Sequence, residues 1–446
     1  MARHLRLFTF TVMLGYMYTS EACAQSISDL WELTQKNDVD LQSAKFRVAN
    51  ASQSLESTGG NLAPSVSVSG LTNRENRYQD RLPETVGYTT SLSARVSQPL
   101  INNPLDPYRK VREKTVLSEK TGYEAAKRSK LYELVTIYIQ AAQNRNSIRL
   151  LKQSVIDLVE QRKLLQARMK ARFRSVKDVD RITLIIEQRQ LQIMQSQRSY
   201  RDLLFKLRAM TYLPRIAIPK VTKFDVTKVI DDYSGNTKRG VNPEVKALEA
   251  NISLIGAQAE QVLYAYKPNL SAFMQLSADD GRDRLSPFEQ SAASGRFQFG
   301  LELTWLLADN GINRVEYVRT LAETNQLKAA IRNKIWTESE STGQIQRNIE
   351  KSFKTLARSQ RVIDTTLKLL ESTREEVEAG ITDTDTLLNL KGEVAQTEVT
   401  YMDASFTVLN DWIALLNVEN RLDSNLLKYL DEKFFIEDDS SNIDEL

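Results

Sequence analysis

The stretch that decides the fold is Arg296-Phe297-Gln298-Phe299-Gly300-Leu301-Glu302-Leu303-Thr304-Trp305. Its apolar residues occupy every second position, so an extended strand places them all on one face and the polar residues on the other. The same period of two recurs in residues 65–69, 88–97 and 270–277. We predict four strands in two hairpins, about 64–100 and 268–307, with polar loops near 73–87 and 279–295.

Outside these two regions the chain has very few helix breakers. Residues 108–213 contain no Pro and one Gly, and residues 312–446 contain no Pro and three Gly. Apolar residues in these stretches step by three and four, as in Ile148, Leu151, Val155 and Leu158, which is coiled-coil spacing. We predict long helical hairpins over about 104–213 and 311–430, with helices on the order of 100 Å.

The two halves of the chain repeat each other. Pro64 corresponds to Pro268 and Asp180 to Asp385, with offsets of 204 and 205 residues. Each half therefore runs helix, strand hairpin, long helix, turn and returning helix. We divide the chain into a segment 1–24, a first repeat 25–213, an irregular linker 214–241, a second repeat 242–430 and an acidic tail 431–446.

The first 24 residues are typical of a removable secretory signal. Arg3 and Arg6 precede an apolar stretch, and Ala22-Cys23-Ala24 predicts cleavage after Ala24. The only His, His4, and the only Cys also lie in this segment. A mature chain without them has no His-based catalysis, thiol nucleophile, disulfide or Cys/His metal site. We therefore expect no enzyme, no metal and no cofactor.

Charge and hydropathy restrict the possible partners further. The formal net charge of +3 is too balanced to indicate a nucleic-acid-binding surface. No uncharged apolar run of 18 residues follows Gln25, so entry into a membrane would need strands. Because single-chain barrels start at about eight strands, four strands predict one barrel shared by several copies. The alternative is a soluble two-hairpin subdomain packed on helices.

Short motifs recur in order along both halves. They are Asn242-Pro243-Glu244, Lys267-Pro268-Asn269-Leu270, Gly300 to Trp305 with Asp309-Asn310-Gly311, Ala63-Pro64-Ser65, Gln98-Pro99-Leu100, and Glu378-Ala379-Gly380-Ile381-Thr382 with Leu387-Leu388. Together they resemble the TolC-like outer-membrane factors, the exit ducts of Gram-negative efflux pumps and type I secretion systems. The resemblance covers essentially the whole chain after residue 24.

The resemblance implies a fold and a set of partners. The fold class is mixed α and β: long coiled-coil hairpins, with four strands per chain contributing to a twelve-stranded barrel in a homotrimer. The barrel would lie in the outer-membrane lipid and the helices would extend into the periplasm. The partners would be a periplasmic adaptor protein and an inner-membrane transporter.

The resemblance also assigns roles to the helix tips. Asp383, Asp385 and Asn389 are candidates for a periplasmic aperture, where three chains would converge. The alternative is that Thr382 or Asp383 simply caps the returning helix. Candidate adaptor contacts are Arg174, Ser175, Val176, Gly380, Ile381 and Thr382. The tip of the first helical hairpin, which holds Arg174, Ser175 and Val176, has no Gly, so whether this tip contacts an adaptor is left undecided.

The two faces of the strands receive separate predictions. Arg95, Arg296 and Glu302 are expected to point into the barrel lumen, with mutual pairing as the alternative. The residues expected to face lipid are Leu92, Val96, Phe297, Phe299, Leu301 and Trp305, with Trp305 near an interface.

Three functions remain to be compared. The first is an export channel, for which a mature chain without a lipid-anchor cysteine slightly favours type I secretion over drug efflux. The second is a periplasmic coiled-coil scaffold or surface adhesin without a pore. The third is a secreted polysaccharide hydrolase with paired carboxylates, which no acidic pair in a Gly-rich, aromatic strand-end context supports.

Overall fold

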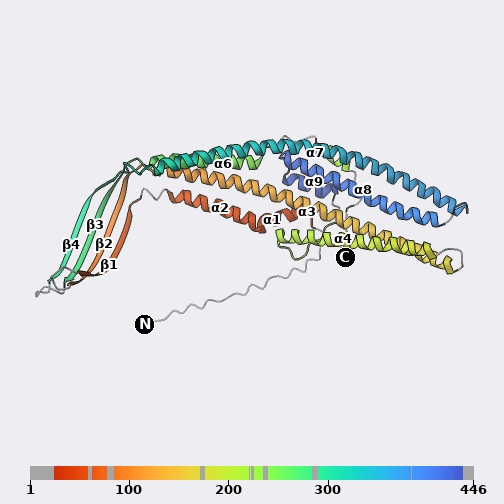
Figure 1. Cartoon of the computed structure of the whole chain (residues 1–446), viewed down its shortest axis with the longest axis horizontal. Helices are drawn as coiled ribbons and strands as arrows, with labels where there is room; N and C mark the ends of the chain where they lie inside the picture. Colours follow the sequence, from red (N-terminus) through yellow and green to blue (C-terminus); the bar gives the residue numbers. More distant parts are fainter. Residues whose placement is uncertain are drawn as a thin grey trace.

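The computed structural model describes residues 25–58, 63–77, 85–170, 176–219, 221, 226–234, 240–283, 290–382 and 384–434. Four strands lie at one end, and the turns of two long helical hairpins lie at the other (Figure 1). The strands are β1 (Ser65–Arg77), β2 (Thr85–Asn102), β3 (Asn269–Asp283) and β4 (Gln290–Thr304). The helices are α1 (Ile27–Asn37), α2 (Val39–Glu56), α3 (Leu105–Lys170), α4 (Val176–Thr211), α5 (Val226–Ser234), α6 (Pro243–Tyr264), α7 (Ile312–Glu378), α8 (Thr384–Val418) and α9 (Ser424–Phe434).

The internal repeat is visible in the order and length of the elements. The series α2, β1, β2, α3, α4 is repeated by α6, β3, β4, α7, α8. Helices α3 and α7 have 66 and 67 residues, and α4 and α8 have 36 and 35. At 1.5 Å per residue, α3 and α7 are each about 100 Å long. The prediction of two long helical hairpins is confirmed.

The four strands form one antiparallel sheet in the order β1-β2-β3-β4. Val96 of β2 lies opposite Val66 of β1 and Met274 of β3, and Met274 lies opposite Phe299 of β4. The alternating apolar residues of all four strands therefore share one face. The strands extend further than their period of two predicted, since β1 reaches Arg77 and β3 reaches Asp283.

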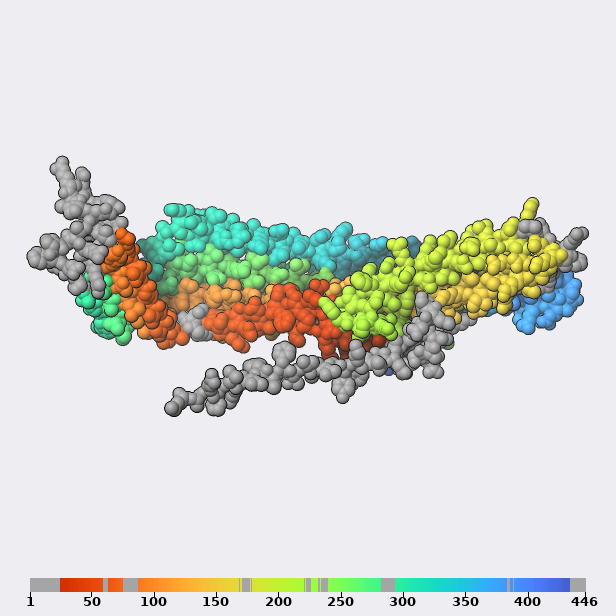
Figure 2. Space-filling model, turned by 90° about the horizontal axis from the view of Figure 1, so that it is seen from below, coloured from red at the N-terminus to blue at the C-terminus, as the bar shows by residue number. Residues whose placement is uncertain are grey.

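The hydrophobic core lies in the helical body, away from the sheet. Its largest cluster joins α1, α3, α4, α8 and α9, and includes the fully buried Leu134, Leu207, Leu409 and Leu427. A second cluster lies between α3 and α4. Seen from below, the helices form a narrow body with the strands projecting from one end (Figure 2). Among the helices of the described ranges, none is both long and apolar enough to cross a membrane.

Two segments differ from their sequence-based boundaries. The linker expected to be irregular contains α5, and α9 continues to Phe434, past the expected end of the second repeat at residue 430. Leu426, Leu427 and Leu430 of α9 are fully buried, which explains why this segment is helical and packed. The expected acidic tail therefore begins inside a helix, and residues 435–446 lie outside the described ranges.

Candidate functional site

The apolar face of the sheet is exposed along all four strands. Its exposed members are Val66, Val68, Leu92, Val96, Met274, Leu276, Phe297, Phe299, Leu301 and Leu303. Phe299 is 78% exposed, more than any other large hydrophobic residue on this face. Water-soluble chains rarely leave a continuous apolar surface of this kind uncovered. The face is therefore built to contact an apolar surrounding or another molecule.

Trp305 continues this face just beyond β4. Its side chain is 55% exposed, and the indole N–H donates a hydrogen bond to the carbonyl of Tyr266 at 2.9 Å. A tryptophan with an apolar ring exposed and its N–H bonded is suited to a boundary between apolar and polar surroundings. Trp305 lies at the helix end of the sheet, and its place at a membrane interface stays a prediction.

The opposite, polar face holds a cluster that links β2, β3 and β4. Arg95 forms an ion pair with Glu302, and its guanidinium lies 4.7 Å from the ring centroid of Phe273. A Cβ atom at Gly300 would lie 3.3 Å from the Phe273 ring, so glycine leaves room for the aromatic side chain. Arg296 lies exposed on the same face. The alternative of mutual pairing thus holds for Arg95 and Glu302.

Only a weak sequence signal indicates this cluster, and it is absent from the sequence-based predictions above. Phe273 is an aromatic residue in a polar position of the alternation, and Gly300 is the residue opposite it. A glycine opposite a misplaced aromatic residue is a recognised pairing in sheets, because the ring covers the glycine backbone. Only the strand register shows that the two are neighbours.

A carboxylate organises the connection from β4 to α7. Asp309 accepts hydrogen bonds from the backbone N–H groups of Gly311, at 3.1 Å, and Asn313, at 2.8 Å. It also accepts the hydroxyl of Tyr266 at 2.8 Å. The N–H of Asn313, together with the Tyr266 hydroxyl, lowers the pKa of Asp309. The Asp309-Asn310-Gly311 motif is therefore a helix-start structure that anchors α7 at the base of the sheet.

The turn after α7 forms the second helix tip. Gly380 has φ +75°, its N–H donates to the carbonyl of Val377 at 3.1 Å, and the N–H of Ile381 donates to the carbonyl of Glu376 at 2.9 Å. These two bonds with a left-handed residue make a Schellman motif, which explains the glycine. The Thr382 hydroxyl donates to the Glu376 carboxylate at 2.7 Å, which ties the turn back to α7.

The positions of the predicted tip residues do not test their predicted roles. Ile381 is 77% exposed, and Asn389 is exposed on α8. Asp383, Arg174 and Ser175 lie outside the described residues. The backbone of Asp385 lies in the first turn of α8, and Val176 begins α4, but their side chains are outside the described set. The aperture and adaptor assignments stay predictions.

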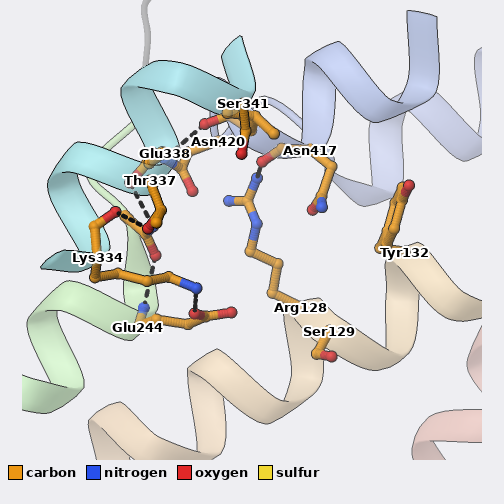
Figure 3. Close-up of a pocket in the computed structure, with 12 residues that line it drawn as sticks. Arg128, Ser129, Tyr132, Glu244, Lys334, Thr337, Glu338, Ser341, Asn417 and Asn420 are labelled. Atoms are coloured by element: carbon orange, nitrogen blue, oxygen red, sulfur yellow. Dashed lines mark hydrogen bonds and ion pairs between the residues drawn. The ribbon is translucent and has the colours of Figure 1, made fainter. Parts of the chain in front are cut away.

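A polar cavity of about 280 Å³ lies where α3, α6, α7 and the end of α8 meet (Figure 3). Arg128 of α3 reaches across it and donates to the carbonyl of Asn417. Lys334 of α7 forms an ion pair with Glu244 of α6. Burial lowers the pKa of Arg128, although the negative charge of Glu244 opposes this effect. The contacts join four helices by charged groups instead of an apolar core.

The described residues contain no group of three or more His, Cys, Asp or Glu side chains that could hold a metal ion. The features that could act on another molecule are therefore the sheet faces, the helix tips and the surface of the helical body.

Comparison with known proteins supports this description. Residues 30–211 match the family model described as outer membrane efflux protein. The predicted family resemblance is confirmed. The description of this family agrees with the expected transport function and with the expected outer-membrane localisation. No curated protein sequence matches the chain.

The fold extends this likeness over both halves of the chain. A structure of CusC, described in terms of folding and transmembrane channel formation, has a TM-score of 0.69 at 14% identity and covers 89% of this chain and 92% of its own. The Campylobacter jejuni CmeC outer membrane channel has a TM-score of 0.68 at 13% identity, covering 94% and 90%. The open state of the Neisseria gonorrhoeae MtrE outer membrane channel has a TM-score of 0.65 at 13% identity, covering 90% and 91%. At these identities the likeness establishes the fold.

Proposed function

We propose that this protein is the outer-membrane exit duct of a tripartite export system. Three copies would place their four-stranded sheets side by side in one twelve-stranded barrel, and their helices would continue the duct into the periplasm. The observation that carries the proposal is the sheet itself: one face is apolar and exposed, and the edge strands β1 and β4 have no partner strand within the described chain. An open edge is not tolerated in hydrocarbon, so a membrane sheet of this size needs further copies.

The partners follow from the proposed duct. A periplasmic adaptor would contact the helix tips, and an inner-membrane transporter would supply the substrate. The exposed Ile381 and the glycine turn beside it support a contact at the second tip. For the transport process, the word efflux in the family description supports efflux as the first candidate. Type I protein secretion is the second candidate, because the only Cys lies in the predicted signal segment and leaves no lipid anchor.

Cysteine labelling of neighbouring residues tests the membrane assignment. Gln298 and Phe299 lie on opposite faces of β4, and the chain has no Cys after Cys23. In intact outer-membrane vesicles, Gln298→Cys should react with a water-soluble maleimide through the lumen. Phe299→Cys should react only after the membrane is dissolved in detergent. Equal reaction of both variants in vesicles would contradict a lipid-facing apolar surface.

The mass of the detergent-extracted protein, corrected for bound detergent, tests the copy number. Three chains per particle agree with the shared barrel. A monomer released by a salt wash without detergent would instead favour the periplasmic scaffold, and the duct would have to be rejected.

The aperture needs a separate measurement. Three copies of Asp383 and Asp385 would place six carboxylates around the periplasmic entrance and favour cations. Replacing both with Ala should raise the leak conductance of the protein in a planar lipid bilayer and lower its cation preference. An unchanged conductance and selectivity would leave these residues as plain helix-start residues.

A further inference from the structure

Gln25, the first residue after the predicted signal segment, is fixed by three hydrogen bonds. Its backbone N–H donates to the carbonyl of Ala217 at 3.0 Å, and its side-chain Oε1 accepts from the N–H of Ala217 at 3.1 Å. Its own carbonyl accepts the hydroxyl of Tyr138 at 2.9 Å. Tyr138 is fully buried in the main core, so the start of the described chain is tied to the interior of the helical body.

The two bonds to Ala217 use both ends of Gln25. Its backbone N–H donates to the C=O of Ala217 and its side-chain oxygen accepts the N–H of the same residue, so the side chain is folded back toward its own backbone nitrogen. This arrangement brings the side-chain amide carbon toward the nitrogen, as closure of a five-membered ring requires. The side-chain Nε2 makes no hydrogen bond with the described residues, so its loss removes no contact among them.

We propose that Gln25 is the mature N-terminus and that it is cyclised to pyroglutamate. The inference rests on the predicted cleavage after Ala24 and is independent of the proposed duct. The uncharged α-amino nitrogen attacks the side-chain amide carbon Cδ, and a bond forms between them. The bond from Cδ to Nε2 breaks, a proton passes from the attacking nitrogen to Nε2, and ammonia leaves. No oxidant, reductant or further reactant is needed.

The product fits the site better than a free N-terminus does. A lactam presents an N–H donor and a C=O acceptor on one edge, which are the two groups that Ala217 bonds. A free α-amino group, with an ordinary pKa near 8, would be mostly charged at neutral pH. Placing that charge in a half-buried position beside Tyr138 costs solvation, and the neutral ring avoids this cost.

Mass spectrometry of the protein purified from outer membranes tests the modification. The N-terminal tryptic peptide should run from residue 25 to Lys36 and be lighter by one ammonia than its uncyclised form. A synthetic peptide of the same sequence, carried through the same steps, measures cyclisation caused by handling. An N-terminal peptide that begins at another residue would overturn the proposal. A cyclised fraction of the protein's peptide no higher than that of the synthetic peptide would overturn it as well.

Hydrogen exchange tests whether the ring is docked. The variant Gln25→Asn keeps an amide, but its side chain is one carbon too short for a five-membered ring. It should speed exchange in the segment around Ala217, whereas Gln53→Asn, at an exposed position of α2, should not. Equal exchange around Ala217 in wild type and Gln25→Asn would show that the N-terminus does not bind there, and would overturn the docked ring even where the mass is as expected.

Discussion

The two long helical hairpins, α3–α4 and α7–α8, match in helix length and helix order, but they differ in the residues buried along their helices. Between α3 and α4 lies a cluster of buried apolar residues, Leu158, Leu165, Val179, Ile182 and Ile186, and Ser154 and Gln161 of α3 are buried as well. On α7 the apolar residues Leu356 and Ile363 are buried, but hydroxyl residues are more numerous: Ser359, Thr366 and Thr373 repeat every seven residues and so occupy one position of the coiled-coil pattern.

The difference shows that two copies of one repeated topology can bury different amounts of apolar surface and so receive different hydrophobic stabilisation. Hydrophobic stabilisation scales with apolar area, about 25 cal/mol per Å², and a Ser or Thr contributes much less of it than a Leu or Ile. Small side chains such as Ser and Thr can still pack closely between two helices without leaving voids. We infer that the α7–α8 hairpin separates at a lower free-energy cost than the α3–α4 hairpin, and local opening should follow this order.

The largest expected effect comes from breaking the apolar cluster between α3 and α4. Leu165→Ala should destabilise the α3–α4 hairpin by about 2–5 kcal/mol, because it leaves a cavity in a closely packed cluster. Hydrogen exchange of peptides from both helices measures the change. Leu164→Ala is the matched control, since Leu164 is its neighbour and is 50% exposed. Equal effects of the two variants would contradict the packing of the cluster.

A second set of substitutions should make the buried residues of α7 as apolar as those of the α3–α4 hairpin. Ser359→Ala, Thr366→Val and Thr373→Val together replace buried hydroxyls with apolar groups. Thr366 donates its hydroxyl to the carbonyl of Val362 in its own helix at 2.8 Å, so valine breaks no bond between helices. We expect slower hydrogen exchange in α7 and α8, which corresponds to a rise in the free energy of local opening of roughly 0.5–1 kcal/mol per substituted position.

The control for this set is Thr365→Val. Thr365 makes the same kind of bond, to the carbonyl of Arg361 at 2.8 Å, but is exposed. It should leave exchange nearly unchanged. Faster exchange in the triple variant would mean that the hydroxyls stabilise the α7–α8 hairpin and that the comparison of the hairpins is wrong.

The contact between the two hairpins offers a smaller test. A Cβ atom at Gly392 of α8 would lie 3.7 Å from Leu158 of α3, at ordinary contact distance. Gly392→Ala should therefore fit, and should stabilise α8 by about 1 kcal/mol through helix propensity. Gly343→Ala in α7 makes no contact with another helix and should give a similar gain. A clear loss at Gly392 alone would show a tighter approach of α8 to α3.

The smallest effect concerns how the halves begin their long helices. Asp309 is bonded at the start of α7, whereas Asp106 at the start of α3 is an exposed residue of the first turn. The lowered pKa of Asp309 means that its stabilising effect is present above the ordinary carboxyl pKa, about 3.9, and is lost as pH falls toward its own pKa.

The pH dependence of thermal unfolding checks this. Asp309→Ala should lower the unfolding midpoint at neutral pH, and the difference from wild type should shrink below about pH 4. Asp106→Ala should lower it less at every pH. A difference for Asp309→Ala that stays constant down to pH 3 would mean that its charge is not the cause.

Sequence patterns predicted the elements well and their partners poorly. The alternation in Arg296–Trp305 and the lack of breakers gave the strands and the paired long helices, because both depend on local periodicity. The cluster of Arg95, Phe273 and Gly300 joins three strands, and its members meet only through the register of the sheet. The Arg128–Asn417 contact likewise joins residues 289 positions apart. Such contacts depend on tertiary packing, which local patterns do not encode.

The contact between the two ends of the described chain affects how the protein can fold. Asp431 in α9 accepts hydrogen bonds from the N–H groups of Ile27, at 2.8 Å, and Ser28, at 3.0 Å, at the start of α1. Ser26 caps α1 locally by accepting the N–H of Asp29, so Asp431, which lies 404 positions after Ile27, satisfies two further N–H groups of the same helix start. The two bonds to Asp431 form only when α9 is packed against α1, so every N–H group that they satisfy depends on contact between the two ends of the described chain.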